Sequence, residues 1–490
     1  GQTVRTMRAA TFALACFQLL VDPSLALHGL KKRLTQHNKP PLTPSPDTLP
    51  VADDADTSID WGDAWEGPTQ HSGFLTFTGD RKDASKPEIN TFFWYLPALN
   101  GDEEAPLLIW LQGGPGGSSL YGMFEEIGPM GVDANMTLYP RDPDYNWNQK
   151  YSLLFLDNPC GVGFSWSNSE SCFVKDEQTV GSDLRLAMLQ FYKLFPELKE
   201  NELYITGESY AGKYVPAFSY TIFSANKNLQ PSDDEYINFK GLSVGDGAMS
   251  PETQFFGFGD LLYNVAMING RERQVIDDYE AKSRAALDAG DTVGAFEQFD
   301  EMLNGDFFPF PTYYTNVTGL TNYFNFEQGD CGSCVPEYYG DWLDLPEIRQ
   351  KIHVGELEYS SFNETVEEYL KADWFVGVVD MLVPLLESDE VKVLVYSGQN
   401  DIILGPPPTE NFLDGLDWEG NDEWLATEKE LWKIEDSGSE QSKNDPVAGY
   451  VTRLEKFGFT YAVVRGAGHM VPGDQPERAY DLISSFVDGQ

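Results

Sequence analysis

The sequence has few cysteines, few histidines and few basic residues for its length. Only five of the 490 residues are cysteine and only five are histidine. The 33 lysines and arginines are outnumbered by 78 aspartates and glutamates, which gives a formal net charge of −45 at pH 7. A chain this acidic repels phosphate backbones, so we expect no nucleic acid partner. We interpret the excess acid as a solvated surface, whose self-repulsion weakens in an acidic compartment.

Membrane-length apolar runs are also lacking after the first residues. The start itself has the pattern of a secretory signal peptide, because Arg5 and Arg8 precede a largely apolar run over residues 9–21. Met7, just before this run, is the expected biological start. We predict that residues 1–26 are a signal peptide, whose removal leaves no membrane anchor. The predicted location is the secretory pathway, ending in a lysosome or vacuole or outside the cell.

Removal of the predicted leader takes Cys16 with it and leaves four cysteines, Cys160, Cys172, Cys331 and Cys334. An even number in a secreted chain suggests disulfides, and three connectivities are open. Cys331-x-x-Cys334 has no second pair and no nearby histidine, so neither zinc nor another metal is expected. Its surroundings do not resemble a thioredoxin unit, and we predict a structural disulfide instead of a redox site.

Three Asn-x-Thr sequons are predicted to be glycosylated, at Asn135, Asn316 and Asn363. Such sequons arise often by chance. Together with the predicted leader, they favour a secretory route.

The chain is predicted to fold around a parallel sheet covered by helices, because short apolar segments alternate with helical spacing. The strands are predicted at residues 73–77, 90–96, 106–111, 152–156, 203–206, 241–245, 391–396 and 460–465. Residues 27–60, rich in proline, threonine and charge, are predicted to be a propeptide or linker without packed structure. From about residue 250 the pattern is helical, with a loop-like stretch at 307–335. We predict one core of residues 61–249 and 376–490, interrupted by a helical cap at 250–375.

A candidate nucleophile stands at Gly207-Glu208-Ser209-Tyr210-Ala211, directly after the predicted strand at 203–206. A strand that ends in Gly-x-Ser and runs into a helix is how the α/β-hydrolase fold makes its nucleophile elbow. The fifth position is alanine instead of glycine, and a serine between small residues is more often an ordinary turn. The motif therefore needs support from the rest of the chain.

A serine hydroxyl becomes a nucleophile when a histidine takes its proton and an acid orients that histidine. In the α/β-hydrolase fold these residues follow the order serine, acid, histidine. Among the histidines only His469 lies after a late strand, and Asp401 is the only acid in the turn after the strand at 391–396. A late histidine can be a packing residue and an aspartate after a strand can be a turn former, but the order favours catalysis. His71 and His353 are interpreted as structural.

A glycine-rich loop follows the predicted central strand at 106–111 and is the expected source of an oxyanion-hole N–H. The other expected donor is the N–H of Tyr210, the residue after the serine. A phosphate-binding loop is the alternative, which we reject because no Lys-Ser/Thr follows the glycines.

Five motifs in this order resemble those of the serine carboxypeptidase family. They are WLQGGPGGSS, FLDNPCGVGFSWS, ITGESYAGKYVP, YSGQND and GAGHMVPGDQPERA. The likeness runs from about Asp60 to the C-terminus and is closest to the vitellogenic carboxypeptidase-like branch, through LNGD, NVTG, YYG, LPEIRQKIHVG and the Gln112 variant. It implies an α/β-hydrolase fold, with a mostly parallel central sheet flanked by helices and an inserted helical cap.

The resemblance also implies a reaction, the removal of single residues from the C-termini of peptides through an acyl-enzyme. Ser209 would attack, His469 would transfer the proton, and Asp401 would hold the imidazole. The N–H groups of Gly114 and Tyr210 would form the oxyanion hole. The terminal carboxylate of the substrate would be held by Gln112, Gly113, Glu126 and Glu208.

The implied pair of glutamates has a physical consequence, because two close carboxylates cannot both ionise cheaply. Protonated, they donate hydrogen bonds to the substrate carboxylate; ionised, they repel it. We predict that affinity for free C-termini weakens as the pH rises above mildly acidic values. Two departures from the family pattern are Gly117, where many members have cysteine, and Cys160, whose thiol would be reactive if unpaired.

The resemblance implies no cofactor and makes a homodimer a candidate state. Two other functions stay open at this point. One is a family acyltransferase or esterase, which the intact glutamate pair disfavours. The other is a non-catalytic stabilising protein on the same fold, which the intact serine, aspartate and histidine disfavour.

Overall fold

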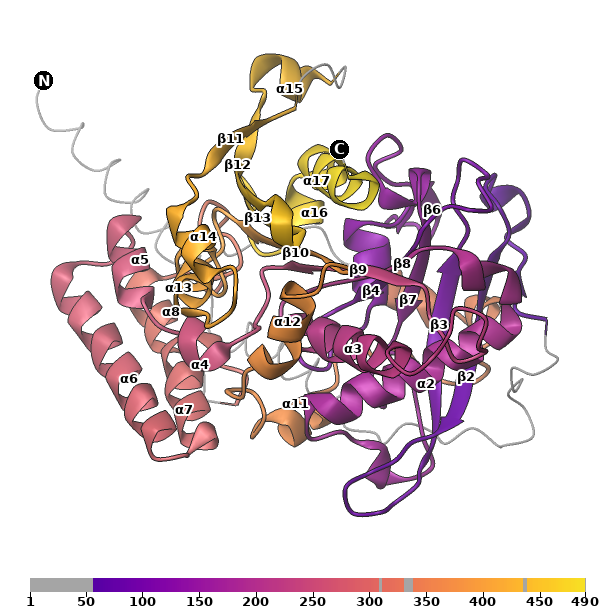
Figure 1. Ribbon diagram of the computed structural model, residues 1–490, viewed down its shortest axis with the longest axis horizontal. Helices are drawn as coiled ribbons and strands as arrows, with labels where there is room; N and C mark the ends of the chain where they lie inside the picture. Colours follow the sequence, from indigo (N-terminus) through magenta and orange to yellow (C-terminus); the bar gives the residue numbers. More distant parts are fainter. Residues whose placement is uncertain (1–55, 308–310, 330–337, 435–438, 490) are drawn as a thin grey trace, which may run out of the picture. The chain divides into compact units, whose positions relative to one another are not determined.

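The computed structural model describes residues 56–307, 311–329, 338–434 and 439–489. The predicted signal peptide, most of the predicted linker and the Cys331–Cys334 pair lie outside these residues, so what was predicted for them stays a prediction. In the part that is described, an 11-stranded sheet is the main element (Figure 1). None of the described helices is long and apolar enough to cross a membrane.

The six central strands of the sheet run parallel, and antiparallel strands extend it at both edges. The order across the sheet is β1-β2-β3-β7-β4-β8-β9-β10-β13-β12-β11. Its strands are β1 (Ser58–Ile59), β2 (Gln70–Thr78), β3 (Glu88–Leu96), β4 (Leu107–Leu111), β7 (Ser152–Leu156), β8 (Leu203–Glu208), β9 (Phe239–Gly245), β10 (Lys392–Gly398), β11 (Glu430–Lys433), β12 (Val447–Leu454) and β13 (Phe459–Val464). A separate hairpin pairs β5 (Met130–Val132) with β6 (Leu138–Pro140).

Strand β4 shows why the central strands are apolar along their whole length. Successive side chains of a strand point to opposite faces, so a sheet covered on both faces needs apolar residues at every position. Leu107 and Ile109 belong to the buried cluster on one face, whereas Leu108 and Trp110 belong to the cluster on the other. The near-continuous apolar run in the sequence therefore correctly predicts a central parallel strand.

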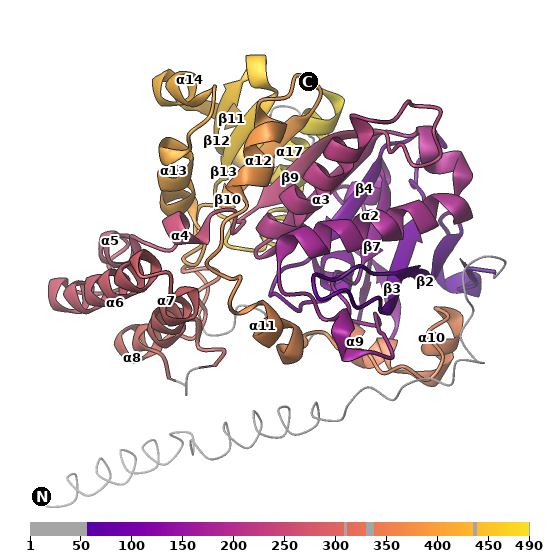
Figure 2. The ribbon, with the colours of Figure 1, turned by 60° about the horizontal axis from the view of Figure 1, so that its bottom comes forward.

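Helices cover both faces of the sheet (Figures 1 and 2). On one face lie α2 (Glu177–Leu194), α3 (Ala211–Asn226) and α12 (Val379–Leu386), and α17 (Pro476–Asp488) lies on the other. The remaining α-helices are α4 (Pro251–Gln254), α5 (Phe258–Asn264), α6 (Gly270–Asp288), α7 (Thr292–Phe299), α8 (Tyr313–Thr318), α9 (Tyr338–Leu343), α10 (Pro346–Lys351), α11 (Glu364–Leu370), α13 (Pro406–Gly415), α14 (Asn421–Ala426), α15 (Glu440–Asn444) and α16 (Val471–Asp474). Short helical turns are η1 (Gly62–Ala64), η2 (Gly122–Glu126), η3 (Trp147–Gln149), η4 (Glu170–Cys172), η5 (Pro196–Glu200), η6 (Asp300–Asn304) and η7 (Glu455–Phe457).

The described residues between β9 and β10 form helices and loops and contribute no strand. Helix α6 begins with a capping box, in which Asn269 and Glu272 each accept a backbone hydrogen bond from the other. Helix α8 lies within the stretch that was predicted to be loop-like, and that prediction was wrong there. The Thr312 side chain accepts from Thr315 N at its start, and Gly319, at φ +75°, ends it.

At the ends of the core, one expectation needs correction and two strands were not predicted. The predicted linker at 27–60 extends too far, because Ser58 and Ile59 pair with β2 and the Ile59 side chain is buried. The sequence also gave no indication of β11 and β12. Exposed residues interrupt both strands, since β11 lies at the open edge of the sheet and β12 lies next to it, so neither has the continuous apolar run that marked the central strands.

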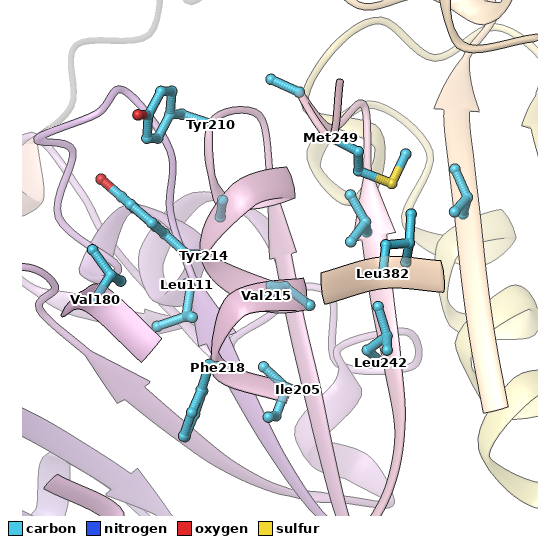
Figure 3. Close-up of a cluster of buried hydrophobic side chains, with 14 of the residues drawn as sticks. Leu111, Val180, Ile205, Tyr210, Tyr214, Val215, Phe218, Leu242, Met249 and Leu382 are labelled. Carbon is cyan, nitrogen blue, oxygen red and sulfur yellow. The ribbon is translucent and has the colours of Figure 1, made fainter. Parts of the chain in front are cut away.

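Glycines on both sides of the turn between β8 and α3 allow a close approach of neighbouring backbone. A Cβ on Gly212 would meet Ala248 N at 2.4 Å, and a Cβ on Gly207 would meet Leu111 O at 2.6 Å. Figure 3 shows the apolar layer beneath, where Val215 and Phe218 of α3 join Ile205 of β8. This layer anchors the turn between β8 and α3, which carries Ser209.

Candidate active site

Ser209 lies in the turn between β8 and α3 with a backbone φ of +64°, a conformation that residues other than glycine rarely adopt. Its N–H donates to Gly245 O at 3.1 Å, and its carbonyl accepts from Ala248 N at 3.0 Å. Such strain costs on the order of 1–3 kcal/mol and is typical of functional sites. The side chain is only half-buried. The turn therefore presents the hydroxyl at the carboxyl edge of the parallel strands.

Asp401 and His469 lie next to each other and are buried. The Nδ1 atom of His469 is 2.8 Å from Oδ2 of Asp401. The two oxygens of Asp401 also accept from the N–H groups of Ile403, at 2.9 Å, and Leu404, at 3.2 Å. With Asp401 ionised, Nδ1 is the donor and Nε2 carries the free lone pair of the imidazole. Nε2 is buried and has no hydrogen-bond partner among the described residues.

The three residues come from three loops at one edge of the sheet. Ser209 follows β8, Asp401 follows β10 and His469 follows β13, and the intervening β9 joins β8 to β10. A hydrogen bond from Asn400 N to Ala467 O, 2.7 Å long, holds the acid loop against the histidine loop. No hydrogen bond joins His469 Nε2 to the Ser209 hydroxyl in this structure. In enzymes without substrate this contact is often long and tightens when substrate binds.

A segment of the region between β9 and β10, residues 323–326, binds both of these loops. Phe324 O accepts from His469 N at 2.7 Å, and its ring lies over the imidazole with centroids 5.1 Å apart. Phe326 N donates to Asn400 O at 3.0 Å, beside Asp401. The segment thus fixes the relation between acid and histidine. Sequence reasoning missed it, because an aromatic residue in a loop carries no signal of a particular partner.

The glycine-rich loop lies against the start of α3. A Cβ on Gly113 would come within 2.5 Å of Tyr210 N and 2.6 Å of the Ser209 Cβ, so only glycine fits there. Gly114 has φ +115° and is exposed. Among the described residues, neither the N–H of Gly114 nor that of Tyr210 donates a hydrogen bond. Two free backbone donors near the serine are what an oxyanion hole requires.

Side chains beneath the loop hold it in place. The Ser118 hydroxyl donates to Asp157 Oδ1 at 2.6 Å, and the Ser119 hydroxyl donates to Leu156 O at 2.6 Å. Phe164 N also donates to Asp157, at 3.0 Å. Burial raises the pKa of Asp157 to about 7, although these hydrogen bonds oppose the shift. Asp157 was not predicted from the sequence, where it reads as one of many aspartates that follow a strand.

Glu126 and Glu208 form a buried carboxyl pair next to the serine, with side chains 2% and 0% exposed. Burial is the main cause that raises the pKa of both, and their mutual repulsion raises that of Glu208 further. Gln112 Nε2 donates to Glu208 Oε1 at 3.0 Å, and Gln112 Oε1 accepts from Trp110 Nε1 at 2.8 Å. The other three carboxyl oxygens have no hydrogen-bond partner among the described residues. Unpartnered buried polar atoms call for a shared proton, a ligand or both.

Tyr210 is also tied to a buried ionic cluster by its side chain. The fully buried Lys213 of α3 donates to the Tyr210 hydroxyl at 3.1 Å and forms an ion pair with Asp373. Its Nζ is 3.8 Å from Glu177 of α2, whose pKa is raised by burial. The cluster links the start of α3 to the segment before α12. Lys213 lies within the motif ITGESYAGKYVP, but the sequence does not show which buried acids it contacts, so its role was not predicted.

Cys160 is not free, because it forms a disulfide with Cys172. The thiol sensitivity that would follow from an unpaired Cys160 is therefore not expected. His71 and His353 occupy structural positions, since each Nδ1 has a hydrogen bond of 3.1 Å, to Thr57 Oγ1 and to Ser72 O respectively.

The three predicted glycosylation sites differ in environment. Asn135 and Asn316 are exposed. Asn363 caps α11, and its Nδ2 donates to Gly161 O at 2.7 Å. Glycan attachment replaces one hydrogen of Nδ2, so a glycan at Asn363 would compete with this bond.

Comparison with known proteins agrees with the site. The family model described as serine carboxypeptidase matches residues 64–489. The human protein "Probable serine carboxypeptidase CPVL" is 40% identical over 86% of this chain and 83% of its own length. The honeybee (Apis mellifera) "Venom serine carboxypeptidase" is 38% identical over 86% and 85%, and the Aedes aegypti "Vitellogenic carboxypeptidase" is 37% identical over 85% and 83%.

A solved structure shows the same fold. It is that of Kex1Δp, a prohormone-processing carboxypeptidase from Saccharomyces cerevisiae, with a TM-score of 0.71 at 22% identity over 90% of this chain and 97% of that one. The sheet of parallel strands with helices on both faces is an α/β-hydrolase fold, as predicted. The chain belongs to the serine carboxypeptidase family, and it is a serine-type carboxypeptidase, a hydrolase.

Proposed function

We propose that the enzyme removes single residues from the C-termini of peptides at acidic pH through an acyl-enzyme on Ser209. His469 takes the proton of the Ser209 hydroxyl and later gives it to the leaving amine, while Asp401 holds the imidazole. The support is the 2.8 Å contact between His469 and Asp401. The Nε2 atom of His469 is free of this contact, and the histidine lies at the same sheet edge as Ser209. Water then attacks the acyl-enzyme and releases the shortened peptide.

The oxyanion of each tetrahedral intermediate is proposed to bind the N–H groups of Gly114 and Tyr210. Their free state in this structure supports the assignment. These donors are fixed before reaction by the loop packing of Gly113 and by the Lys213 cluster, so no reorganisation is needed as charge develops.

Recognition of the C-terminus is proposed to rest on Glu126 and Glu208, with Gln112 and the N–H of Gly113. The single observation that carries this function is the buried carboxyl pair with three oxygens that lack a partner. Protonated carboxyls donate hydrogen bonds to a carboxylate, which explains how an acidic site can bind an anion. An internal peptide bond offers no such anion, so the pair selects chain ends.

We further propose that residues 1–26 are removed on secretion, that 27–60 include a propeptide, and that 250–375 act as a cap on a core of 61–249 and 376–490. The Cys160–Cys172 disulfide and the exposed sequons at Asn135 and Asn316 support an oxidising secretory route that ends in a lysosome or vacuole or outside the cell. Glycosylation is proposed for these two asparagines, and the Nδ2 bond of Asn363 makes it the least favoured of the three. A homodimer remains a proposed state for light scattering to test.

A peptide library incubated at two pH values and analysed by mass spectrometry tests the proposed activity. We expect stepwise loss of C-terminal residues, which is faster at the acidic pH. Peptides with a C-terminal amide should be trimmed more slowly than the corresponding free acids. Equal trimming of amides, or cleavage within chains, would refute the proposed recognition of the carboxylate. Transfer of an acyl group to an alcohol without peptide trimming would instead support the acyltransferase alternative.

A further inference from the structure

Asp246 is a buried acid close to Asp401 that the mechanism does not use. Asp246 follows β9, is fully buried, and has φ +41°. Its Oδ1 accepts from Gly398 N at 2.8 Å, and its Oδ2 has no hydrogen-bond partner among the described residues. Ligand atoms of Asp246, Asp401 and His469 all lie within 4.8 Å of one another. A buried unpartnered oxygen so close to a carboxylate needs an explanation.

We propose that Asp246 carries a proton on Oδ2 and donates it in a hydrogen bond to Asp401, as a positioning residue for the acid–histidine pair. The proposal rests on the roles proposed above for Ser209, Asp401 and His469. It adds a neutral acid to that arrangement, and the acid itself does not touch the substrate.

The distribution of hydrogen bonds decides which acid holds the proton. Asp401 already accepts from two backbone N–H groups and from His469, so a proton of its own would compete with three donors. Among the described residues, Asp246 accepts from one N–H, that of Gly398. Two carboxylates in contact in a buried site cannot both be ionised at low cost, so the proton stays on the less supported one.

The groups around Asp246 favour the same assignment. Burial and the charge of Asp401 raise the pKa of Asp246, and Asp474 of α16 adds to the effect. Glu208 of β8 lies close enough to Asp246 for the two carboxyl groups to repel each other when ionised. Tyr396 of β10 and Tyr461 of β13 also face it, and burial keeps both phenols neutral. The basic group His469 is also close to it, and its Nδ1 is hydrogen-bonded to Asp401.

The same three residues have the spacing of metal ligands, but a cation explains the geometry less well. The Nδ1 of His469 is hydrogen-bonded to Oδ2 of Asp401, and Oδ2 also accepts from Leu404 N, so a cation at a common centre would have to compete with both hydrogen bonds. A proton on Asp246 satisfies its orphan oxygen without disturbing that bond.

The backbone of Asp246 connects this acid to the nucleophile. Its N–H donates to Tyr396 O at 2.8 Å, at the end of the strand that leads to Asp401. Its neighbour Gly245 accepts from Ser209 N, and Ala248 N donates to Ser209 O. One turn therefore holds Ser209 through its main chain and Asp401 through its side chain.

The proton matters because His469 must be neutral to act as a base. An ionised Asp246 would place a second negative charge beside the imidazole and favour its protonated, inactive form. A neutral donor instead disperses the charge of Asp401. Asp246 would thus extend the activity toward lower pH.

The test measures the rate at which a fluorophosphonate labels Ser209 as a function of pH. This reaction needs the serine, the histidine and the oxyanion hole, but it needs no substrate carboxylate. The variants are Asp246→Asn, which keeps a neutral donor of the same shape, and Asp246→Gly, which removes the group and suits a positive φ. Asp142→Gly is the matched control, because Asp142 has φ +39° and lies in the loop after β6.

We expect the acidic limb of the Asp246→Asn profile to coincide with that of the wild type within about 0.3 pH units. In Asp246→Gly it should move to higher pH by about one unit, a tenfold loss of labelling rate on that limb. The control should match the wild type.

Three results would overturn the proposal. A shift of the Asp246→Asn limb to lower pH would show that the wild-type residue is ionised, and this holds even if Asp246→Gly does not fold. A wild-type pH profile in a folded Asp246→Gly would show that Asp246 does not act on the pair of Asp401 and His469. An unlabelled wild type would refute the proposed role of Ser209 and this inference with it, whereas normal labelling without peptide trimming would refute only the proposed substrate.

Discussion

The pH dependence of substrate binding is the most informative consequence of the buried glutamate pair. Raised pKa values of Glu126 and Glu208 mean that the pair holds protons at acidic pH and loses one as the pH climbs through the raised range. Below that range the pair donates hydrogen bonds to the substrate carboxylate. Above it, a newly ionised carboxylate repels the same group, so affinity falls as pH rises.

The size of the effect follows from Coulomb's law. Two unit charges about 5 Å apart repel by about 3 kcal/mol at an effective dielectric constant of about 20. That energy corresponds to roughly a hundredfold loss of affinity. The side chains are 2% and 0% exposed, so solvent screens little of it. We therefore expect KM for a blocked dipeptide to rise by about tenfold to a hundredfold between mildly acidic and neutral pH, with a smaller change in kcat.

The assay compares kcat/KM for a blocked dipeptide acid with that for its C-terminal amide. The ratio cancels the titration of the base, which affects both substrates. In Glu126→Gln the side chain is neutral at every pH and still donates, so the ratio should lose most of its pH dependence. A wild-type ratio that stays flat with pH, or a Glu126→Gln ratio with the wild-type slope, would refute the reasoning.

Three further predictions concern stability and orientation. Ser209→Gly should be more stable than Ser209→Ala by about 1 kcal/mol in urea unfolding, because glycine tolerates φ +64°; equal stabilities would contradict the strain. The raised pKa of Asp157, about 7, means that the folded protein holds a proton that the unfolded chain releases, so stability should fall as the pH rises from about 4 to about 7. Asp157→Asn should abolish roughly 4 kcal/mol of this fall in thermal or urea unfolding, and an unchanged slope would count against it. Phe324→Ala should lower kcat about tenfold and leave KM nearly unchanged, since the ring orients His469 and not the substrate. A change in KM with an unchanged kcat would contradict this role.

Residues whose environment is set by their immediate neighbours could be predicted from the sequence. Ser152–Leu156 was predicted as a strand with the bounds that the structure has, because the four consecutive apolar residues after Ser152 are typical of a fully covered strand. The same holds for the elbow, where small residues around Ser209 are needed for a close approach of helix and sheet. Chain order then sufficed to select Asp401 and His469, which the structure places 2.8 Å apart.

Residues whose role depends on distant contacts could not be predicted. Phe324 lies 145 positions before His469 in the chain, and only the fold brings its ring over the imidazole. Asp246 reads as an aspartate between two glycines in a turn, and its significance appears when β9 is found between β8 and β10. The partner of Cys160 was one of several options until the loop bearing Cys172 was placed beside it.

The central claim is that Ser209 cleaves the last peptide bond of a chain whose carboxylate is held by the glutamate pair. Rapid-quench mass spectrometry with a blocked dipeptide at acidic pH tests it most directly. We predict that the wild type releases the C-terminal amino acid and transiently carries the blocked residue on Ser209, and that Ser209→Ala does neither. Release of the amino acid by Ser209→Ala at the wild-type rate, or an acyl group on any other residue, would contradict the account.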